Sequence, residues 1–160
     1  MSREIKVSFN KSLKLTNVLI AELPLKEISQ GDSFPLLVRQ MENYIKQKGF
    51  MPIGPLIQKT SYSINEEGQI DVQLFFMRQS NNFIHNVEEP YKMESLIRVR
   101  NCMYARYIGP EEKLKFAYDK INVTAFEEDV ELSNENYTIF VDQQDENIVA
   151  DVFVEKKSNE

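Results

Sequence analysis

The stretch Met103–Tyr118, with the sequence MYARYIGPEEKLKFAY, decides the fold that the rest of the chain follows. It has the pattern of a strand end, a Gly109-Pro110 break and the first turns of a helix. Proline is favoured at the first helical position because its missing N–H would have no partner there, and Glu111 and Glu112 suit the positive end of the helix dipole. Apolar residues at helical spacing follow: Leu114, Ala117, Tyr118 and Ile121. The stretch predicts a strand-to-helix junction in an α+β protein.

The segments on either side of this junction have equally clear patterns. Residues 13–23 predict a strand, and residues 34–46 predict a helix with its N-cap at Asp32 or Ser33 and its end at Gly49. Further strands are expected at 56–64, 70–77, 96–107, 132–141 and 147–155, with a helix at about 110–124. Residues 65–68 and 142–146 have the composition of hairpin turns.

The two halves of the chain carry the same order of predicted elements. Gln69–Phe75 lines up with Asn147–Phe153 at an offset of about 78 residues, long enough for one supersecondary unit. We therefore expect a single domain, 1–160, of two pseudo-repeats at about 11–78 and 94–156. A linker at about 79–92 and a disordered tail at 156–160 complete the prediction. The expected fold is α+β, a duplicated β-α-β-β unit whose antiparallel sheet carries two helices on one face and a groove between the halves.

Composition excludes several classes of function. There are 19 Lys and Arg against 25 Asp and Glu, a net charge of −6, which argues against nucleic-acid binding. No apolar run approaches the ~20 residues of a membrane span, and the first residues do not resemble a signal peptide. The single cysteine, Cys102, cannot form an internal disulfide. The expectation is a cytoplasmic protein without cofactor or metal, either a monomer or a homodimer.

A carboxylate and a tyrosine share one face of the strand predicted at 132–141. Glu135, Tyr137, Ile139 and Val141 alternate along it, so Glu135 begins an otherwise apolar face. An inward carboxylate among aromatic rings would attract an organic cation. Glu135 at an exposed strand start, simply solvated, is the competing interpretation.

Other aromatic and apolar residues are candidates for the wall of a binding site, although core packing is the commoner role of such residues on strands. They are Tyr62, Phe75, Met77, Tyr104, Tyr107 and Phe140. Tyr104 and Tyr107 flank the junction, but alternation points them to opposite faces of a regular strand, so at most one of them lines a given wall.

The remaining reactive residues favour plain structural roles. His85 lies in a polar loop without recognisable catalytic or metal-binding partners, and Cys102 on a strand is expected to be a buried small hydrophobe. Arg98, Arg100 and Arg106 are expected on one strand face, either binding an anion or paired with acidic residues across strands. We favour the paired, solvated arrangement for the arginines.

The junction Ala105–Tyr118, the β-α-β-β order and the triplet Glu135-Asn136-Tyr137 together resemble the gyrase-inhibitor-like (GyrI-like) small-molecule-binding fold. That fold also forms the effector-binding domains of multidrug-responsive transcription activators. The resemblance implies that Glu135 is the acid of a pocket for cationic aromatic ligands and that Tyr137 is its neighbour. The chain departs from the pattern in having no Trp and in showing residues 125–129, AFEED, where a Trp-rich segment and a second Gly-Pro are usual. It is also similar to uncharacterised Gram-positive relatives associated with type VII secretion.

The expected function is a stand-alone small-molecule-binding module without a DNA-binding domain. Its ligand would be amphipathic or cationic, bound by Glu135, Tyr137, Tyr107, Tyr104, Phe75 and Tyr62. The first alternative is a protein-interaction or accessory factor, for example of a secretion or toxin system, with its groove filled by side chains. The second is a small-electrophile hydrolase that uses Glu135 and Tyr137, although an enzyme is the less favoured class.

Overall fold

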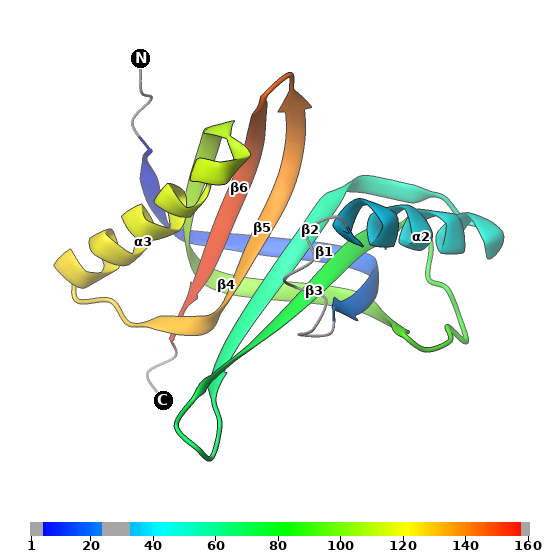
Figure 1. Ribbon diagram of the computed structural model, residues 1–160, viewed down its shortest axis with the longest axis horizontal. Helices are drawn as coiled ribbons and strands as arrows, with labels where there is room; N and C mark the ends of the chain where they lie inside the picture. Colours follow the sequence, from blue (N-terminus) through cyan, green and yellow to red (C-terminus); the bar gives the residue numbers. More distant parts are fainter. Residues whose placement is uncertain (1–4, 24–32, 158–160) are drawn as a thin grey trace. The chain divides into compact units, whose positions relative to one another are not determined.

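The computed structural model describes residues 5–23 and 33–157, and it confirms the α+β class (Figure 1). The elements, in chain order, are β1 (Val7–Leu23), α2 (Ser33–Gln47), β2 (Pro52–Ile64), β3 (Ile70–Ser80), β4 (Tyr91–Pro110), a 3-10 helix (Glu111–Lys113), α3 (Lys115–Glu127), β5 (Leu132–Gln144) and β6 (Asn147–Lys156). No helix within these residues combines the length and apolarity needed to cross a membrane. The expected N-cap at Asp32 lies outside the described residues.

The chain divides into two compact units. The α2 unit comprises Lys14–Arg98, and the α3 unit comprises the described residues of Met1–Leu13 and Val99–Glu160. Each unit contains a strand, a helix and a hairpin of two further strands, in that order. Both unit boundaries fall inside long strands, β1 and β4, whereas the sequence predicts a boundary in the polar segment 79–92.

That polar segment folds onto the α2 unit. Ile84 is 1% exposed and belongs to the same core as Met41 and Ile45 of α2. The Glu88 backbone N–H donates to the Tyr44 hydroxyl at 3.0 Å, and Lys48 donates to the Glu88 carboxylate at 2.7 Å. A buried isoleucine and these bonds make residues 81–90 part of the α2 unit.

In the α2 unit the antiparallel strand order is β1-β3-β2. Ala21 of β1 faces Phe76 of β3, and Leu74 of β3 faces Thr60 of β2. The face that carries Leu74 and Phe76 packs on α2, and buried side chains of α2, β1 and β3 fill the interface. Helix α2 ends at Gln47, and Gly49 follows with a φ of 88° that suits glycine. The Gly49 N–H donates to Lys46 O and the Phe50 N–H to Ile45 O.

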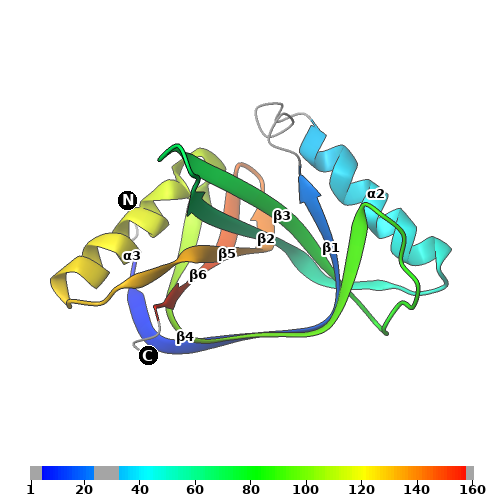
Figure 2. The ribbon, with the colours of Figure 1, turned by 90° about the horizontal axis from the view of Figure 1, so that it is seen from below.

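The α3 unit repeats this arrangement with the antiparallel order β4-β6-β5. Alternate residues of β4 and β6 pack against α3, and Figure 2 shows each helix to one side of the strands of its own unit. The core members are Met103, Ala105 and Tyr107 of β4, Ala117, Ile121 and Ala125 of α3, and Ile148, Ala150, Val152 and Val154 of β6. Leu114 and Tyr118 pack against this core, so the apolar face predicted for the helix is confirmed.

The junction differs from the prediction at Pro110. Pro110 is the last residue of β4, with extended ψ of 140°, and a 3-10 turn separates it from α3. The Tyr107 hydroxyl donates to the Pro110 carbonyl and fixes the end of the strand. A Cβ on Gly109 would lie 2.7 Å from that hydroxyl oxygen. The glycine is therefore required by the close approach of the Tyr107 ring, and Pro110 precedes the helix as its cap.

Strands β1, β2 and β4 begin earlier than alternation predicts, at Val7, Pro52 and Tyr91. Asn17 in β1 and Asn101 in β4 adopt positive φ, 51° and 58°, a conformation that asparagine tolerates well. After each of them two successive residues are buried, such as Cys102 and Met103. Such an irregularity shifts the alternation by one residue within the strand. The parts of β1 and β4 that the prediction misses, 7–12 and 91–95, precede these asparagines and are half-buried or exposed, so no run of buried residues marks them.

Candidate ligand-binding face

The sheet of the α3 unit has a second face, turned away from α3, which carries three aromatic rings. Because Met103, Ala105, Ala150 and Val152 pack on α3, their neighbours along β4 and β6 point the other way. Tyr104 of β4 faces Phe153 of β6, and Phe153 faces Tyr137 of β5, in register across three adjacent strands. We call the side of the sheet that carries Tyr104, Tyr137 and Phe153 the aromatic face.

The rings on this face pack closely. The centroids of Tyr104 and Phe153 are 4.9 Å apart with the planes tilted at 44°, within the range of favourable aromatic pairs. Tyr137 is 5% exposed and Phe153 is 9% exposed, whereas Tyr104 is half-buried. The pairing of three strands places these rings side by side, an arrangement that residues of one strand alone cannot form.

An ion pair lies next to the rings. Asp151 is two residues before Phe153 on the same face and faces Arg106 of β4. Arg106 donates through Nε to Asp151 Oδ1 at 2.8 Å and through Nη2 to Oδ2 at 3.0 Å, a bidentate pair. The Tyr104 hydroxyl donates to the same Oδ1 at 2.7 Å. The carboxylate thus joins the arginine to the ring of Tyr104.

Burial and this network set the protonation of the nearby groups. Burial, and secondly the hydrogen bond to Asp151, raise the pKa of Tyr104 to about 12. The hydrogen bond to Asp151 raises the pKa of Arg106 above its already high ordinary value. Burial raises the pKa of the Cys102 thiol to about 11. At neutral pH Tyr104 is therefore a neutral donor, Arg106 is charged, and Cys102 is an unreactive thiol, as the sequence predicts.

Glu135 lies on β5 two residues before Tyr137. The β5–β6 ladder shifts register between Leu132 and Asn136. Within that irregular stretch the Glu135 N–H donates to Ser133 Oγ at 3.2 Å, and the Ser133 hydroxyl donates to the Glu135 carbonyl at 3.3 Å. Glu135 itself is half-buried. Ser133 therefore holds the backbone that positions the candidate acid.

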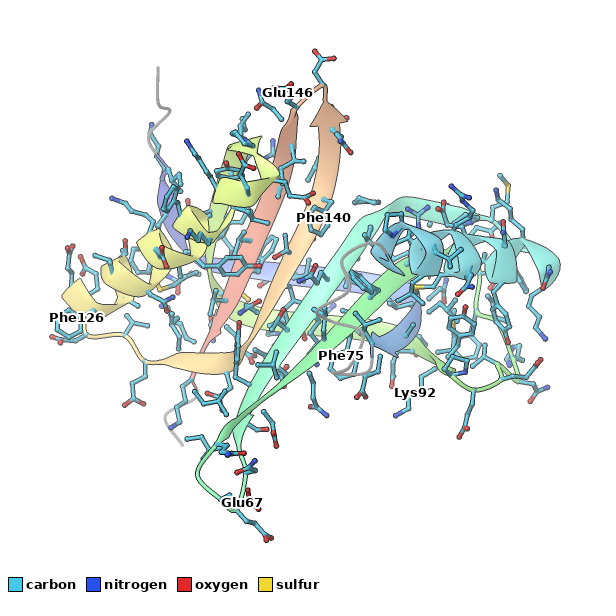
Figure 3. The ribbon with its side chains drawn as sticks, viewed as in Figure 1. Glu67, Phe75, Lys92, Phe126, Phe140 and Glu146 are labelled. Atoms are coloured by element: carbon cyan, nitrogen blue, oxygen red, sulfur yellow. The ribbon has the colours of Figure 1, made fainter. Side chains whose placement is uncertain are left out.

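The other predicted site residues lie elsewhere. Tyr107 is 6% exposed and belongs to the core under α3, on the opposite side of the sheet from Tyr104. Phe140 packs against the same core. Phe75 and Tyr62 belong to the α2 unit, where β2 and β3 place them on opposite faces of the sheet, and Figure 3 marks Phe75 on β3. The structure thus brings Tyr104 and Tyr137 together on one side of the sheet, places Glu135 two residues before Tyr137 on β5, and gives Tyr107 a packing role.

Sequence reasoning missed Phe153 and Asp151 as members of the site and placed Arg106 only in a general pairing. Alternation of Val149, Asp151 and Phe153 was a usable signal for one face of β6. It could not identify Tyr104 and Tyr137 as the neighbours of Phe153, because register across strands depends on tertiary structure. The cross-strand pairing favoured for the arginines is confirmed at Arg106, the partner of Asp151.

The remaining candidates keep structural or surface roles. His85 is exposed and stacks edge-on against Phe83, with ring centroids 4.9 Å apart. Arg98 and Arg100 are exposed on β4 before the positive-φ residue Asn101. Among the described residues, no three His, Cys, Asp or Glu side chains gather as a metal-binding set.

Comparison with known proteins supports the fold. No protein-family model matches the chain, and no curated protein is significantly similar to it. Among solved structures, a complex of EcmrR with DNA matches with a TM-score of 0.67 at 17% identity, over 96% of this chain and 58% of EcmrR. A structure of SAV2435 bound to tetraphenylphosphonium matches with a TM-score of 0.53 at 9% identity, over 98% of this chain and 95% of that one. A hydrolase encoded by lin2189 of Listeria innocua matches with a TM-score of 0.53 at 10% identity, over 97% of this chain and 92% of that one.

At these identities the likenesses concern the fold alone. The chain spans less than two thirds of the length of EcmrR, so it corresponds to a part of that protein. It corresponds to nearly the whole of SAV2435 and of the Listeria hydrolase. The shared architecture is the α+β arrangement described above.

Proposed function

We propose that the chain is a small-molecule-binding protein whose aromatic face receives an amphipathic organic cation. The observation that carries this proposal is the placement of Tyr104, Phe153 and Tyr137 in register on three adjacent strands, with Glu135 two residues before Tyr137 on β5. Ring faces attract cations through their quadrupole, by about 0.5–2 kcal/mol per ring depending on desolvation. A carboxylate at the edge of the rings adds the charge that selects a cation over a neutral molecule of similar shape.

The ligand of one similar structure supports an organic cation as the ligand class. SAV2435 binds tetraphenylphosphonium, a lipophilic aromatic cation, and its chain matches this one over nearly its whole length. The resemblance of Glu135-Asn136-Tyr137 to the GyrI-like pattern gives the same pairing of an acid with a tyrosine.

The test is a calorimetric titration of the whole chain with tetraphenylphosphonium and with triphenylphosphine oxide, an uncharged aromatic probe. We expect the cation to bind more tightly than the neutral probe, and Glu135→Gln to weaken the cation about tenfold while changing the neutral probe little. The matched control is Glu67→Gln, at the exposed tip of the β2–β3 hairpin (Figure 3), which should leave both affinities unchanged.

Two results would contradict the proposal. If neither probe bound the folded wild type, the face would not be a ligand site, and a protein partner would become the better explanation. If the cation bound equally well to wild type and to Glu135→Gln, Glu135 would not be the acid of the site. Consumption of an electrophilic ester by wild type, lost in Glu135→Gln, would instead establish hydrolysis.

A further inference from the structure

The aromatic face carries one acid placed there by the strand register, Asp151, and this acid has its own counter-ion. Asp151 accepts two hydrogen bonds from Arg106 and one from Tyr104, so three donors converge on one carboxylate. The Asp151 side chain is 15% exposed, whereas the Arg106 side chain is 49% exposed. The negative charge is thus held within the face and the positive charge lies at its solvent-exposed border.

This ion pair is connected to the rings by contact. The Tyr104 hydroxyl that donates to Asp151 belongs to the ring packed 4.9 Å from Phe153. A ligand in contact with the half-buried Tyr104 ring would therefore lie within a few ångströms of both members of the pair. At such distances a single unit charge changes the binding free energy of a charged ligand measurably, even in partly solvated surroundings.

Arg106 also has donors to spare. A guanidinium carries five N–H groups, and the two bonds to Asp151 use one on Nε and one on Nη2. With about half of the side chain exposed, the remaining donors lie where a ligand or water can reach them. The border of the aromatic face can thus interact with an acceptor group as well as with a cation.

We propose that the Asp151–Arg106 pair sets the charge selectivity of the aromatic face. Arg106 cancels the charge of Asp151 beside the rings, so the wild-type face accepts bulky aromatic ions with only the modest cation preference that Glu135 supplies. This inference rests on the proposed function, because it assigns selectivity to the same site.

The test uses two probes of nearly the same shape and opposite charge, tetraphenylphosphonium and tetraphenylborate, titrated into the whole chain. Arg106→Gln leaves Asp151 uncompensated and should raise the cation-to-anion affinity ratio about three- to tenfold. Asp151→Asn leaves Arg106 uncompensated and should lower the same ratio by a similar factor. The double variant Arg106→Gln/Asp151→Asn is neutral at both positions and should return the ratio to near the wild-type value.

Controls separate charge from structure. Arg100→Gln removes an exposed arginine from the same strand and Asp119→Asn an exposed acid from α3, and neither should change the ratio. Arg106→Lys keeps the charge and loses the bidentate geometry, so its ratio should stay close to that of wild type. Circular dichroism and thermal unfolding of each variant establish that the sheet is intact.

The outcomes distinguish this inference from the proposed function. Binding of tetraphenylphosphonium to wild type, with a ratio that neither Arg106→Gln nor Asp151→Asn alters, would overturn the inference and leave the proposed function standing. Binding of the cation to Arg106→Gln alone would support the inference and contradict cation binding by the natural chain. Absence of binding in every folded variant would overturn both.

Discussion

Phe75 of the α2 unit and Phe153 of the α3 unit occupy corresponding places in two similar sheets, yet their surroundings differ. Each lies on the middle strand of its unit, on the face turned away from the helix. Phe153 has Tyr104 and Tyr137 as its cross-strand neighbours, whereas Phe75 has Glu22 and Lys59. The Lys59 ammonium lies 5.5 Å from the centroid of the Phe75 ring.

The difference shows how one scaffold can give two kinds of surface. In the α2 unit a cation of the chain itself already lies over the phenylalanine ring. In the α3 unit the equivalent ring is extended by two tyrosines, and the nearest ion pair, Asp151 with Arg106, lies beside the rings. Under the proposed function the rings of the α3 unit receive a foreign cation, whereas the ring of Phe75 already has an internal one.

The largest effect is expected at the junction, where the two units differ most in their tolerance of a side chain. Gly109→Ala should lower the free energy of unfolding by about 2–3 kcal/mol, because the new Cβ would meet the Tyr107 ring. Gly54→Ala in the α2 unit meets only the end of the flexible Gln79 side chain, at 3.2 Å, but has a φ of 71°. Its loss should be about 1 kcal/mol, from backbone strain.

Urea unfolding of both glycine variants measures these losses. In a chain that already carries Tyr107→Leu, Gly109→Ala should lower the free energy of unfolding by less than it does in the wild type, because the ring that would meet the new Cβ is gone. Equal losses for Gly109→Ala and Gly54→Ala would show that the Tyr107 contact is unimportant.

Next in size is the contribution of the two phenylalanines to ligand binding. Phe153→Leu should weaken tetraphenylphosphonium binding about tenfold, because it removes the central ring of the aromatic face. Phe75→Leu should weaken it by less than about threefold, since Lys59 already lies over that ring. Calorimetric titration of the two folded variants compares them directly. A larger loss of affinity for Phe75→Leu than for Phe153→Leu would show that the main ligand contact is in the α2 unit.

A smaller effect is expected at Thr60 and Thr138, which face Leu74 and Val152 in the two sheets. Thr138 is 1% exposed, and its hydroxyl oxygen has no hydrogen-bond partner among the described residues. Thr138→Val should raise the free energy of unfolding by about 1 kcal/mol, because it removes an unsatisfied buried hydroxyl without changing the side-chain shape. Thr60→Val, at 9% exposure, should change it less. Thermal and urea unfolding would reveal the opposite order if the Thr138 hydroxyl were satisfied.

The smallest effect concerns the hydroxyl that joins the rings to the ion pair. Tyr104 has its pKa raised from 10.0 to about 12, so the folded protein retains this proton where the unfolded chain loses it. The stabilisation is complete below pH 10 and is lost as the pH rises from 10 towards 12. The difference in free energy of unfolding between wild type and Tyr104→Phe should therefore shrink over that range. Urea unfolding at successive pH values measures it, and a constant difference would contradict a raised pKa.

Much of the architecture could be predicted from local sequence. The helix at 115–127 and its buried Ala117 and Ile121 follow from helical spacing, and the turn at 65–68 follows from its composition. In that turn the Asn65 side chain accepts hydrogen bonds from the N–H groups of Glu67 and Gln69, both at 2.9 Å. The starts of β1 and β4 could not be predicted, because residues 7–12 and 91–95 are half-buried or exposed and no run of buried residues marks them.

The candidate site was predictable only in part. Alternation names Tyr104, Tyr137 and Glu135 as candidates one at a time. It does not show that Tyr107 lies under α3, and it does not predict the rings and charges that surround Tyr104 and Tyr137. The distance between Tyr104 and Asp151 along the chain is too long for any local pattern to link them. Their hydrogen bond exists because β4 and β6 pair in one particular register.

The sequence by itself determined the kind and order of the elements and the apolar face of the helix after the junction, because these depend on spacing between near neighbours and on the chemistry of turns. The tertiary structure alone decided which strands pair, and therefore which rings and charges meet. A shift of one residue in the pairing of β4 with β6 would turn Asp151 and Phe153 towards the opposite side of the sheet relative to their present partners. Register is set by the whole packed core of each unit, and no single segment of the sequence contains it.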